Sequence, residues 1–95
     1  MNKYEIMFIV RPDMEEAEIK ATAEEMKKVL TDGNATIIEE KSMGQRELAY
    51  EIKKFSTGYY FLFIAEANAE VVKEFDRIVR INEKLLRHLI VKVEE

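Results

Sequence analysis

The chain has 95 residues, of which 47% are hydrophobic and 36% charged, and its net charge is −4 at pH 7. These values are ordinary for one small globular domain, and we predict a single domain spanning residues 1–95. The chain contains no cysteine, which excludes disulfides, thiolate nucleophiles and cysteine-ligated metal sites. No apolar run approaches the ~20 residues that span a membrane, and the start is unlike an export signal. We therefore expect a cytoplasmic location and no membrane partner.

Charge is unevenly distributed along the chain. Residues 1–45 carry six basic and ten acidic side chains, whereas residues 46–95 carry nine of each. Within residues 77–93, five basic side chains stand against one acidic side chain. A net acidic protein is a poor general binder of nucleic acid, so any contact with a polyanion is expected in this basic segment. The alternative is an ordinary solvated helix end and strand edge.

The first part of the chain predicts a strand followed by a helix. Residues 3–11 are apolar on both alternating faces, which is typical of a central strand. Asp13 is expected to cap the helix N-terminus, with Glu16 at the capping-box spacing. Residues 14–31 have apolar side chains at helical spacing. Gly33 suits the left-handed position that ends a helix.

The middle of the chain predicts a long hairpin. Residues 35–41 form a strand, which is expected to bulge at Met43–Gly44 before it resumes over residues 46–52. The alternation within residues 46–52 predicts a half-buried strand. The unbroken apolar and aromatic run over residues 58–67 predicts a strand in the middle of the sheet. The polar residues between these two strands are too few for a crossover, so the strands pair as neighbours.

The last third predicts a second helix and a fourth strand. Asn68 is expected to cap a helix whose apolar residues, from Val71 to Val79, recur at helical spacing. Asn82 closes this helix, and residues 85–93 form the last strand. The order β-α-β-β-α-β with right-handed crossovers predicts an α+β, ferredoxin-like fold. In this fold a four-stranded antiparallel sheet has the order 4-1-3-2, with both helices on one face.

This arrangement leaves one face of the sheet uncovered. The two strands predicted to be central are apolar on both sides, yet helices cover only one side. If Phe8 and Phe61 face the helices, an apolar patch lies on the open face, made of Met7, Ile9, Tyr60, Leu62 and Ile64. Exposed apolar patches of several hundred Å² mark partner surfaces, so these residues are our candidates for contact with a protein partner. Self-association or cover by a terminal segment is the alternative.

The sequence offers few groups for catalysis. His88 is the only histidine, and no metal-binding histidine motif or glycine-rich phosphate loop is present. We expect His88 to lie at the sheet edge or against a helix. The same fold hosts small phosphatases and metal chaperones, but Pro12–Asp13 after the first strand is unfavourable to phosphate, and a metal chaperone needs a cysteine pair. We predict that the protein is not an enzyme and has no cofactor, metal or small-molecule substrate.

RNA recognition modules share this topology and provide an alternative function, the binding of single-stranded RNA. Their third strand carries a basic residue, a glycine and aromatic residues that stack on RNA bases. Residues 57–64 match the glycine and two aromatic positions but lack the basic first residue and the last aromatic residue. Stacking on RNA would require Tyr59 and Phe61 on the open face, which is opposite to the parity predicted above.

Several short motifs, in order along the whole chain, carry a family resemblance. They are Lys3-Tyr4-Glu5-Ile6, Ile9-Val10-Arg11-Pro12, Arg46 followed by Leu48-Ala49-Tyr50-Glu51-Ile52, Gly58-Tyr59, Glu74-Phe75-Asp76-Arg77, Ile81-Asn82 and Arg87-His88-Leu89-Ile90-Val91-Lys92. Together they resemble, from end to end, the bacterial small-subunit ribosomal protein six family. The resemblance implies the ferredoxin-like fold and a non-catalytic component of the ribosome.

The same resemblance implies partners and contact residues. Members of the family pair with small-subunit ribosomal protein eighteen, and the heterodimer binds the central domain of the small-subunit ribosomal RNA during assembly. Family members carry basic residues at four positions, which are our RNA-contact candidates: Arg46, Arg80, Arg87 and Lys92. The sequence departs from the family at Gln45 and Glu47, where relatives commonly have basic residues, so two phosphate contacts expected of relatives are missing.

Overall fold

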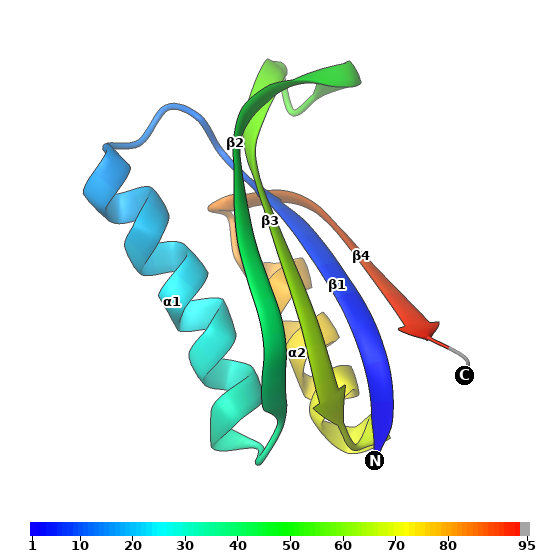
Figure 1. The fold of residues 1–95 in the computed structure, drawn as a ribbon. Helices are drawn as coiled ribbons and strands as arrows, with labels where there is room; N and C mark the ends of the chain where they lie inside the picture. The colour runs from blue at the N-terminus through cyan, green and yellow to red at the C-terminus, as the bar shows by residue number, and fades with distance from the viewer. Residues whose placement is uncertain (94–95) are drawn as a thin grey trace.

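The computed structural model describes residues 1–93 and contains four strands and two helices (Figure 1). They are β1 (Asn2–Val10), α1 (Glu16–Asp32), β2 (Thr36–Ile52), β3 (Phe55–Ala67), α2 (Ala69–Ile81) and β4 (Leu85–Val93). The strands form one antiparallel sheet in the order β2-β3-β1-β4. This is the predicted order counted from the opposite edge, so the α+β, ferredoxin-like fold is confirmed. Glu94 and Glu95, the last residues of the predicted domain, lie outside the described residues.

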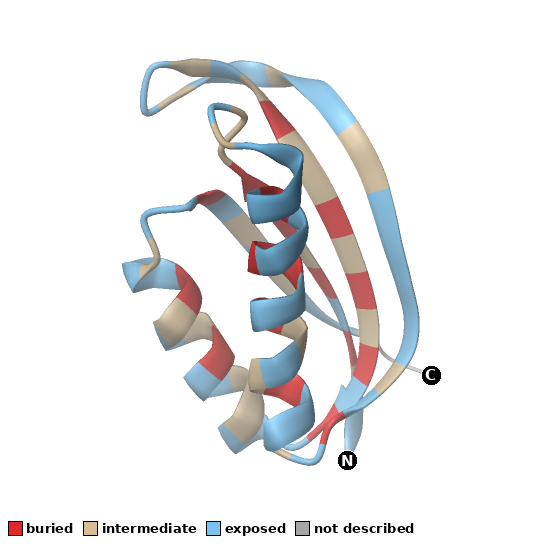
Figure 2. Cartoon of the chain, turned by 90° about the vertical axis from the view of Figure 1, so that its left-hand side faces the viewer, coloured by how far each residue is buried: buried red, intermediate tan, exposed pale blue. Residues whose placement is uncertain are grey.

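The core lies between the sheet and the two helices, which cover the same face of the sheet (Figure 2). Phe8, at the centre of β1, is fully buried. Its ring stacks on Phe61 and meets Phe63 edge-on, and both pairs of ring centroids are 5.4 Å apart. The helices cover these rings with a row of buried side chains: Ile19, Ala23, Met26, Leu30, Phe75 and Val79.

The two central strands alternate between the core and the open face with the predicted parity. On β1 the alternate residues Ile6, Phe8 and Val10 are buried in the core. On β3 Phe61 and Phe63 are buried in the same core, whereas their neighbours in the chain are only partly buried. The difference follows from the layer architecture, because helices cover one face of these strands and leave the other face open.

The predicted cap at the start of α1 is wrong. The helix begins one residue after Glu15, which makes no side-chain cap hydrogen bond. The Asp13 carboxylate instead accepts hydrogen bonds from the guanidinium of Arg11, at 3.2 and 2.9 Å. A nearby arginine therefore takes the carboxylate that the capping-box spacing assigned to the helix amides. Asn68 does occupy the N-cap position of α2, as predicted, although its side chain makes no cap hydrogen bond.

The end of α1 also differs from the prediction. Gly33 has a φ of −89°, and the left-handed residue is Asn34, with a φ of 67°. Gly33 is required for another reason, because a Cβ at this position would lie 2.7 Å from two methyl carbons of Val71. The lack of a side chain at Gly33 thus lets the end of α1 pack closely against the start of α2.

β2 and β3 form a long hairpin that projects beyond the end of the sheet (Figure 1). The predicted irregularity near Gly44 is confirmed: the register shifts between Ser42 and Gly44, and Gly44 has a φ of +78°. The hairpin turns at Lys53 and Lys54, whose φ values are 49° and 71°. β3 therefore begins at Phe55, earlier than the sequence pattern predicted.

The prediction that residues 46–52 form a half-buried strand is confirmed only in part, because Leu48 and Ile52 are partly buried whereas Tyr50, on the same face, is exposed. No residue of this segment is buried, and the Tyr50 side chain is 58% exposed. The segment pairs only with the start of β3, beyond the region that the helices cover. Its alternation of polar and apolar residues therefore gives one exposed side and one side that is only partly covered, on a hairpin that projects beyond the helices.

Candidate protein and RNA interface

An apolar patch lies on the face of the sheet opposite the helices. The register places Met7 between Leu62 of β3 and Leu89 of β4, so the patch crosses three strands. Leu89 is 54% exposed and Val91 is 46% exposed, which is high for large apolar side chains. We call this surface the open-face patch and define it as Met7, Tyr60, Leu62, Ile64, Leu89 and Val91.

The sequence candidates for the protein partner differ in how much surface they offer. Met7, Tyr60, Leu62 and Ile64 are partly exposed on the open face. Ile9 has the same parity but is only 5% exposed. The start of β3 packs against it so closely that a Cβ on Gly58 would lie 2.3 Å from Cγ2 of Ile9. Ile9 therefore supports the patch from below and offers little surface of its own.

Sequence reasoning missed Leu89 and Val91. The signal was present, because Leu89 and Val91 alternate with His88, Ile90 and Lys92 along one strand. The basic side chains of residues 77–93 are the more prominent signal in this segment, and they obscure the apolar residues that lie between them. The register of β4 against β1 shows that they extend the predicted patch to the edge of the sheet.

Charged side chains border the open-face patch. Glu5 lies between Ile64 and Val91 in the register of the sheet. On β2, Glu39 and Lys41 pair with patch residues of β3, and their charged groups are 3.5 Å apart. An apolar centre with a polar rim is the usual arrangement of a protein interface.

The four basic candidates for RNA contact do not form a single cluster. Arg80, at the end of α2, and Arg87, at the start of β4, line the same pocket. Arg46 lies on the hairpin, where its Nε donates a hydrogen bond to the Met43 carbonyl at 3.2 Å. Lys92 lies near the other end of β4, opposite Tyr4. The structure thus brings together two of the four candidates.

Three contacts hold the projecting hairpin over the end of the sheet. They join hairpin residues to β4 and to the segment after β1. The Arg87 guanidinium lies 5.5 Å from the ring centroid of Tyr50, and a cation–π contact of this kind contributes about 0.5–1 kcal/mol at an exposed site. The other two contacts are Arg11 over the Phe55 ring at 5.1 Å and the hydrogen bond from Lys53 Nζ to the Leu85 carbonyl at 3.4 Å.

His88 lies on the edge strand and against a helix, as predicted. Its Nε2 is 2.6 Å from Oδ1 of Asp76 on α2, and Oδ2 of the same carboxylate is 3.0 Å from the Arg80 guanidinium. The hydrogen bond from His88, together with the nearby charge of Arg80, lowers the pKa of Asp76 below its ordinary value. The carboxylate therefore links α2 to β4 and holds two side chains in place.

Replacing Asp76 with asparagine should lower the free energy of unfolding by about 1–2 kcal/mol at neutral pH, because hydrogen bonds to charged groups contribute roughly that much at partly exposed sites. The lowered pKa of Asp76 means that the ionised carboxylate stabilises the fold above its ordinary pKa of 3.8. This contribution is lost as the pH falls through the lowered folded value. Urea denaturation from neutral pH to about pH 2 measures the loss.

The matched control for this prediction is Glu25→Gln, which neutralises an exposed carboxylate on α1. In the control, the free energy of unfolding should fall with pH as it does in the unmodified protein. In Asp76→Asn, it should change less as the pH falls. If the free energy of unfolding had the same pH dependence in Asp76→Asn and in the unmodified protein, the assigned role of the carboxylate would be contradicted.

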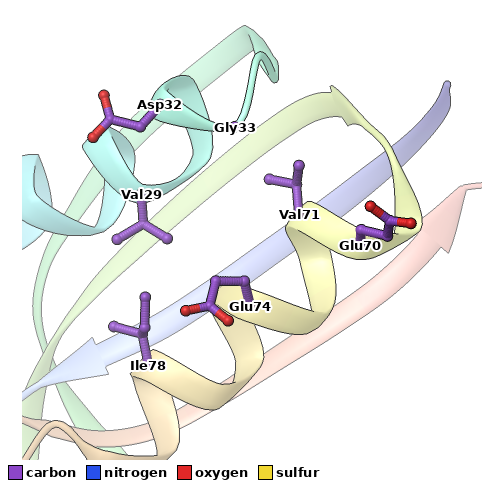
Figure 3. Close-up of a pocket in the computed structure, with 7 residues that line it drawn as sticks. All are labelled: Val29, Asp32, Gly33, Glu70, Val71, Glu74 and Ile78. Atoms are coloured by element: carbon purple, nitrogen blue, oxygen red, sulfur yellow. The ribbon is translucent and has the colours of Figure 1, made fainter.

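A groove of about 420 Å³ lies between the ends of the two helices (Figure 3). Val29, Val71 and Ile78 point into the gap between α1 and α2, and the side chains of Asp32, Glu70 and Glu74 lie around it. Aliphatic groups and surface carboxylates offer no cationic group for RNA. Across residues 1–93, no three histidine, aspartate or glutamate side chains are placed to hold a metal ion. Neither α1 nor α2 is long and apolar enough to cross a membrane.

The recognition-module alternative is not supported by the parity of β3. That alternative places Tyr59 and Phe61 on the open face. Phe61 is buried and stacks on Phe8, and Tyr59 packs against the core on the helix side. Neither ring is available to stack on an RNA base in the manner of a recognition module.

Comparison with known proteins agrees with the fold and with the motifs. The family model of ribosomal protein S6 matches residues 3–92. Among solved structures, the crystal structure of 30S ribosomal protein S6 from Thermotoga maritima matches with a TM-score of 0.92 and 29% sequence identity, over 97% of this chain and 87% of that chain. The chain therefore belongs to the ribosomal protein S6 family.

Proposed function

We propose that this protein is a structural component of the small ribosomal subunit and binds small-subunit ribosomal RNA together with small-subunit ribosomal protein eighteen. It acts on the cytoplasmic ribosome, in subunit assembly and translation, and contacts the central domain of the RNA. Family membership supports a ribosomal role. The observation that carries the two-partner mechanism is the open-face patch, a coherent apolar surface that the fold leaves uncovered.

The open-face patch supports a protein partner better than an RNA partner. Tyr60 is its only aromatic residue, so successive RNA bases have no stacking platform there. Aliphatic side chains such as Leu62 and Leu89 gain free energy when they leave water, at about 25 cal/mol per Å² of apolar surface. A second protein that covers this surface adds a layer on the face of the sheet opposite the helices.

The charge of the protein supports joint binding to RNA. A net charge of −4 gives RNA little long-range attraction to this protein alone. Several basic side chains are also engaged within the protein, such as Lys27 with Glu40 and Arg77 with Glu74. Gln45, at a position where the family resemblance leads us to expect a basic residue, is uncharged and donates a hydrogen bond to Thr57 at 3.1 Å. A basic partner supplies the missing positive charge, and exposed arginines and lysines of this chain then reach phosphates.

The test is a titration of central-domain small-subunit ribosomal RNA with this protein alone, and then with ribosomal protein eighteen present. We expect weak binding alone and tight binding by the pair, because the partner neutralises the joint surface. Gel-shift or fluorescence anisotropy measurements at fixed salt give the two affinities. Equally tight binding by this protein alone would overturn the two-partner mechanism.

A further inference from the structure

The groove between α1 and α2 has an apolar floor and an acidic rim (Figure 3). Val29, Val71 and Ile78 pack against the core but are only partly buried, so each leaves apolar surface in the groove. Asp32 and Glu70 are exposed, and their carboxylates lie around this surface. No basic side chain of residues 1–93 lines the groove. The groove therefore combines apolar surface with negative charge.

Two of the carboxylates on the rim have no cationic partner within the protein. Across the described part of the chain, neither Asp32 nor Glu70 makes an ion pair or a side-chain hydrogen bond. The third carboxylate, that of Glu74, accepts hydrogen bonds from the Arg77 guanidinium, which lowers the pKa of Glu74. Glu74 is thus ionised but compensated, and the groove keeps the charges of Asp32 and Glu70.

Asp32 is unfavourable for the helix that carries it. It is the last residue of α1, where the helix dipole presents its negative end and favours basic side chains. α1 has no basic residue in its last turn. A carboxylate at this position lowers the stability of the helix, and no contact within residues 1–93 offsets the loss. A cation supplied by another molecule would compensate both the carboxylate and the helix end.

The groove lies on the side of the molecule opposite the open-face patch. It is formed by the two helices, which cover the other face of the sheet (Figure 2). A protein that covers the open face therefore leaves the groove accessible. The carboxylates repel phosphate groups, so the charge of the groove is unsuited to nucleic acid. Its aliphatic floor instead gains free energy when aliphatic side chains cover it.

The length of the groove limits what can occupy it. From Glu70 to Ile78 it follows α2 for about 12 Å, at about 1.5 Å per helical residue. An extended chain covers this distance with about four residues, at roughly 3.3 Å each. A short extended segment that carries aliphatic and basic side chains therefore matches the groove in length, apolarity and charge.

We propose that the groove docks a basic protein segment of about four extended residues. Aliphatic side chains of the segment cover Val29, Val71 and Ile78, and its lysine or arginine side chains pair with Asp32 and Glu70. The segment belongs to a protein other than the one that covers the open face. This proposal goes beyond the proposed function and does not depend on it, because it involves neither RNA nor ribosomal protein eighteen. The protein then holds partners on both of its faces.

The first test titrates the full-length protein with a synthetic hexapeptide that alternates lysine and leucine, followed by methyl NMR. We expect saturable shifts for the methyl groups of Val29, Val71 and Ile78, and unchanged resonances for Leu62 and Leu89 on the open face. Hexapeptides that alternate lysine with serine, or glutamate with leucine, should bind at least about tenfold more weakly, because each lacks one of the two attractions. Equal binding of all three peptides, or no shifts in the groove, would overturn the proposal.

The second test removes the two uncompensated carboxylates. Asp32→Asn combined with Glu70→Gln should weaken binding of the lysine–leucine peptide by about tenfold, the effect of losing two exposed ion pairs. The matched control, Glu18→Gln combined with Glu25→Gln, makes the same change in net charge at exposed positions of α1 and should leave the affinity unchanged. Equal weakening in both double variants would mean that the peptide responds to net charge alone, which would overturn the proposal.

The stability of Asp32→Asn separates a binding role from a structural one. The single variant should raise the midpoint of thermal unfolding, because it removes an anion from the negative end of α1. A lower midpoint would mean that Asp32 serves the fold, and would overturn its assignment to a partner.

Two further titrations distinguish the proposal from its alternatives. Spermidine carries positive charge on an aliphatic chain but has no side chains, and it should bind more weakly than the lysine–leucine peptide. If spermidine shifts the groove methyl groups at equal affinity, the groove is a polyamine site and the proposal is overturned. The peptide should bind equally well with ribosomal protein eighteen present, and competition between them would also overturn the proposal. If the peptide binds but ribosomal protein eighteen does not, the proposed function alone fails.

Discussion

Replacing Tyr60 and Leu62 together with alanine should weaken the binding of ribosomal protein eighteen by about 30- to 700-fold, which corresponds to roughly 2–4 kcal/mol for two central anchors of an interface. Both side chains lie on β3 within the open-face patch, flanked by β1 and β2. In the free protein these side chains are partly exposed, and their apolar surface leaves water only when the partner binds. The loss should therefore fall on binding and far less on folding.

The double variant should keep the fold, with a loss of no more than about 2 kcal/mol in the free energy of unfolding, because neither side chain belongs to the buried core. The matched control is Ile81→Ala, which removes an exposed apolar side chain at the end of α2. Isothermal titration calorimetry should give an unchanged affinity for this control. An unchanged affinity in the double variant, or loss of its fold, would contradict the assigned role of the patch.

The largest effect on stability is expected from Phe8→Ala, which should lower the free energy of unfolding by about 3–5 kcal/mol. Phe8 is fully buried and contacts the rings of Phe61 and Phe63. Its removal leaves a cavity at the centre of the sheet, where the surrounding strands cannot collapse. A domain of this size has a total stability of only about 5–14 kcal/mol, so this single change removes a large fraction of it.

Urea denaturation followed by circular dichroism measures this loss. The matched control is Tyr50→Ala, an aromatic truncation on the projecting hairpin, where the ring is mostly exposed. It should lose no more than about 1 kcal/mol, the contribution of its cation–π contact. Comparable losses in the two variants would mean that the stability of the sheet does not depend on the aromatic cluster around Phe8.

Much of the fold follows from the sequence because the spacing of apolar residues differs between the strands and the helices. β1 and β3 are apolar on both faces, and this pattern predicted their central positions in the sheet. The pattern does not say which side faces the helices, and the structure places Phe8 and Phe61 on that side. The apolar stripe from Val71 to Val79 likewise predicted α2. These features depend on patterns within one segment, which a sequence shows directly.

The errors occur where a segment depends on a neighbour that the sequence does not identify. The capping-box spacing at Asp13 was present, but Arg11 competes for the same carboxylate. The alternation of residues 46–52 is the same for a half-buried strand and for a hairpin that projects beyond the helices. Only the lengths and register of β2 and β3 distinguish these two outcomes.

The candidate surfaces were predictable to different extents. The part of the open-face patch on β1 and β3 follows from strand parity, whereas Leu89 and Val91 join it only through the register of β4. The pocket that Arg80 and Arg87 line was predictable only in part, because these two arginines belong to the basic segment of residues 77–93, whereas Lys53 reaches the pocket only after the hairpin curves over the end of the sheet. Long-range proximity of this kind leaves no periodic signal.

The central claim is that the open face of the sheet exists to be covered by a protein partner. Methyl NMR spectra recorded while ribosomal protein eighteen is added test it most directly. The account predicts large shifts for the methyl groups of Leu62, Ile64 and Leu89, and none for those of Val29 and Val71 in the groove between the helices. Shifts confined to the groove, with the open-face methyl groups unchanged, would contradict it.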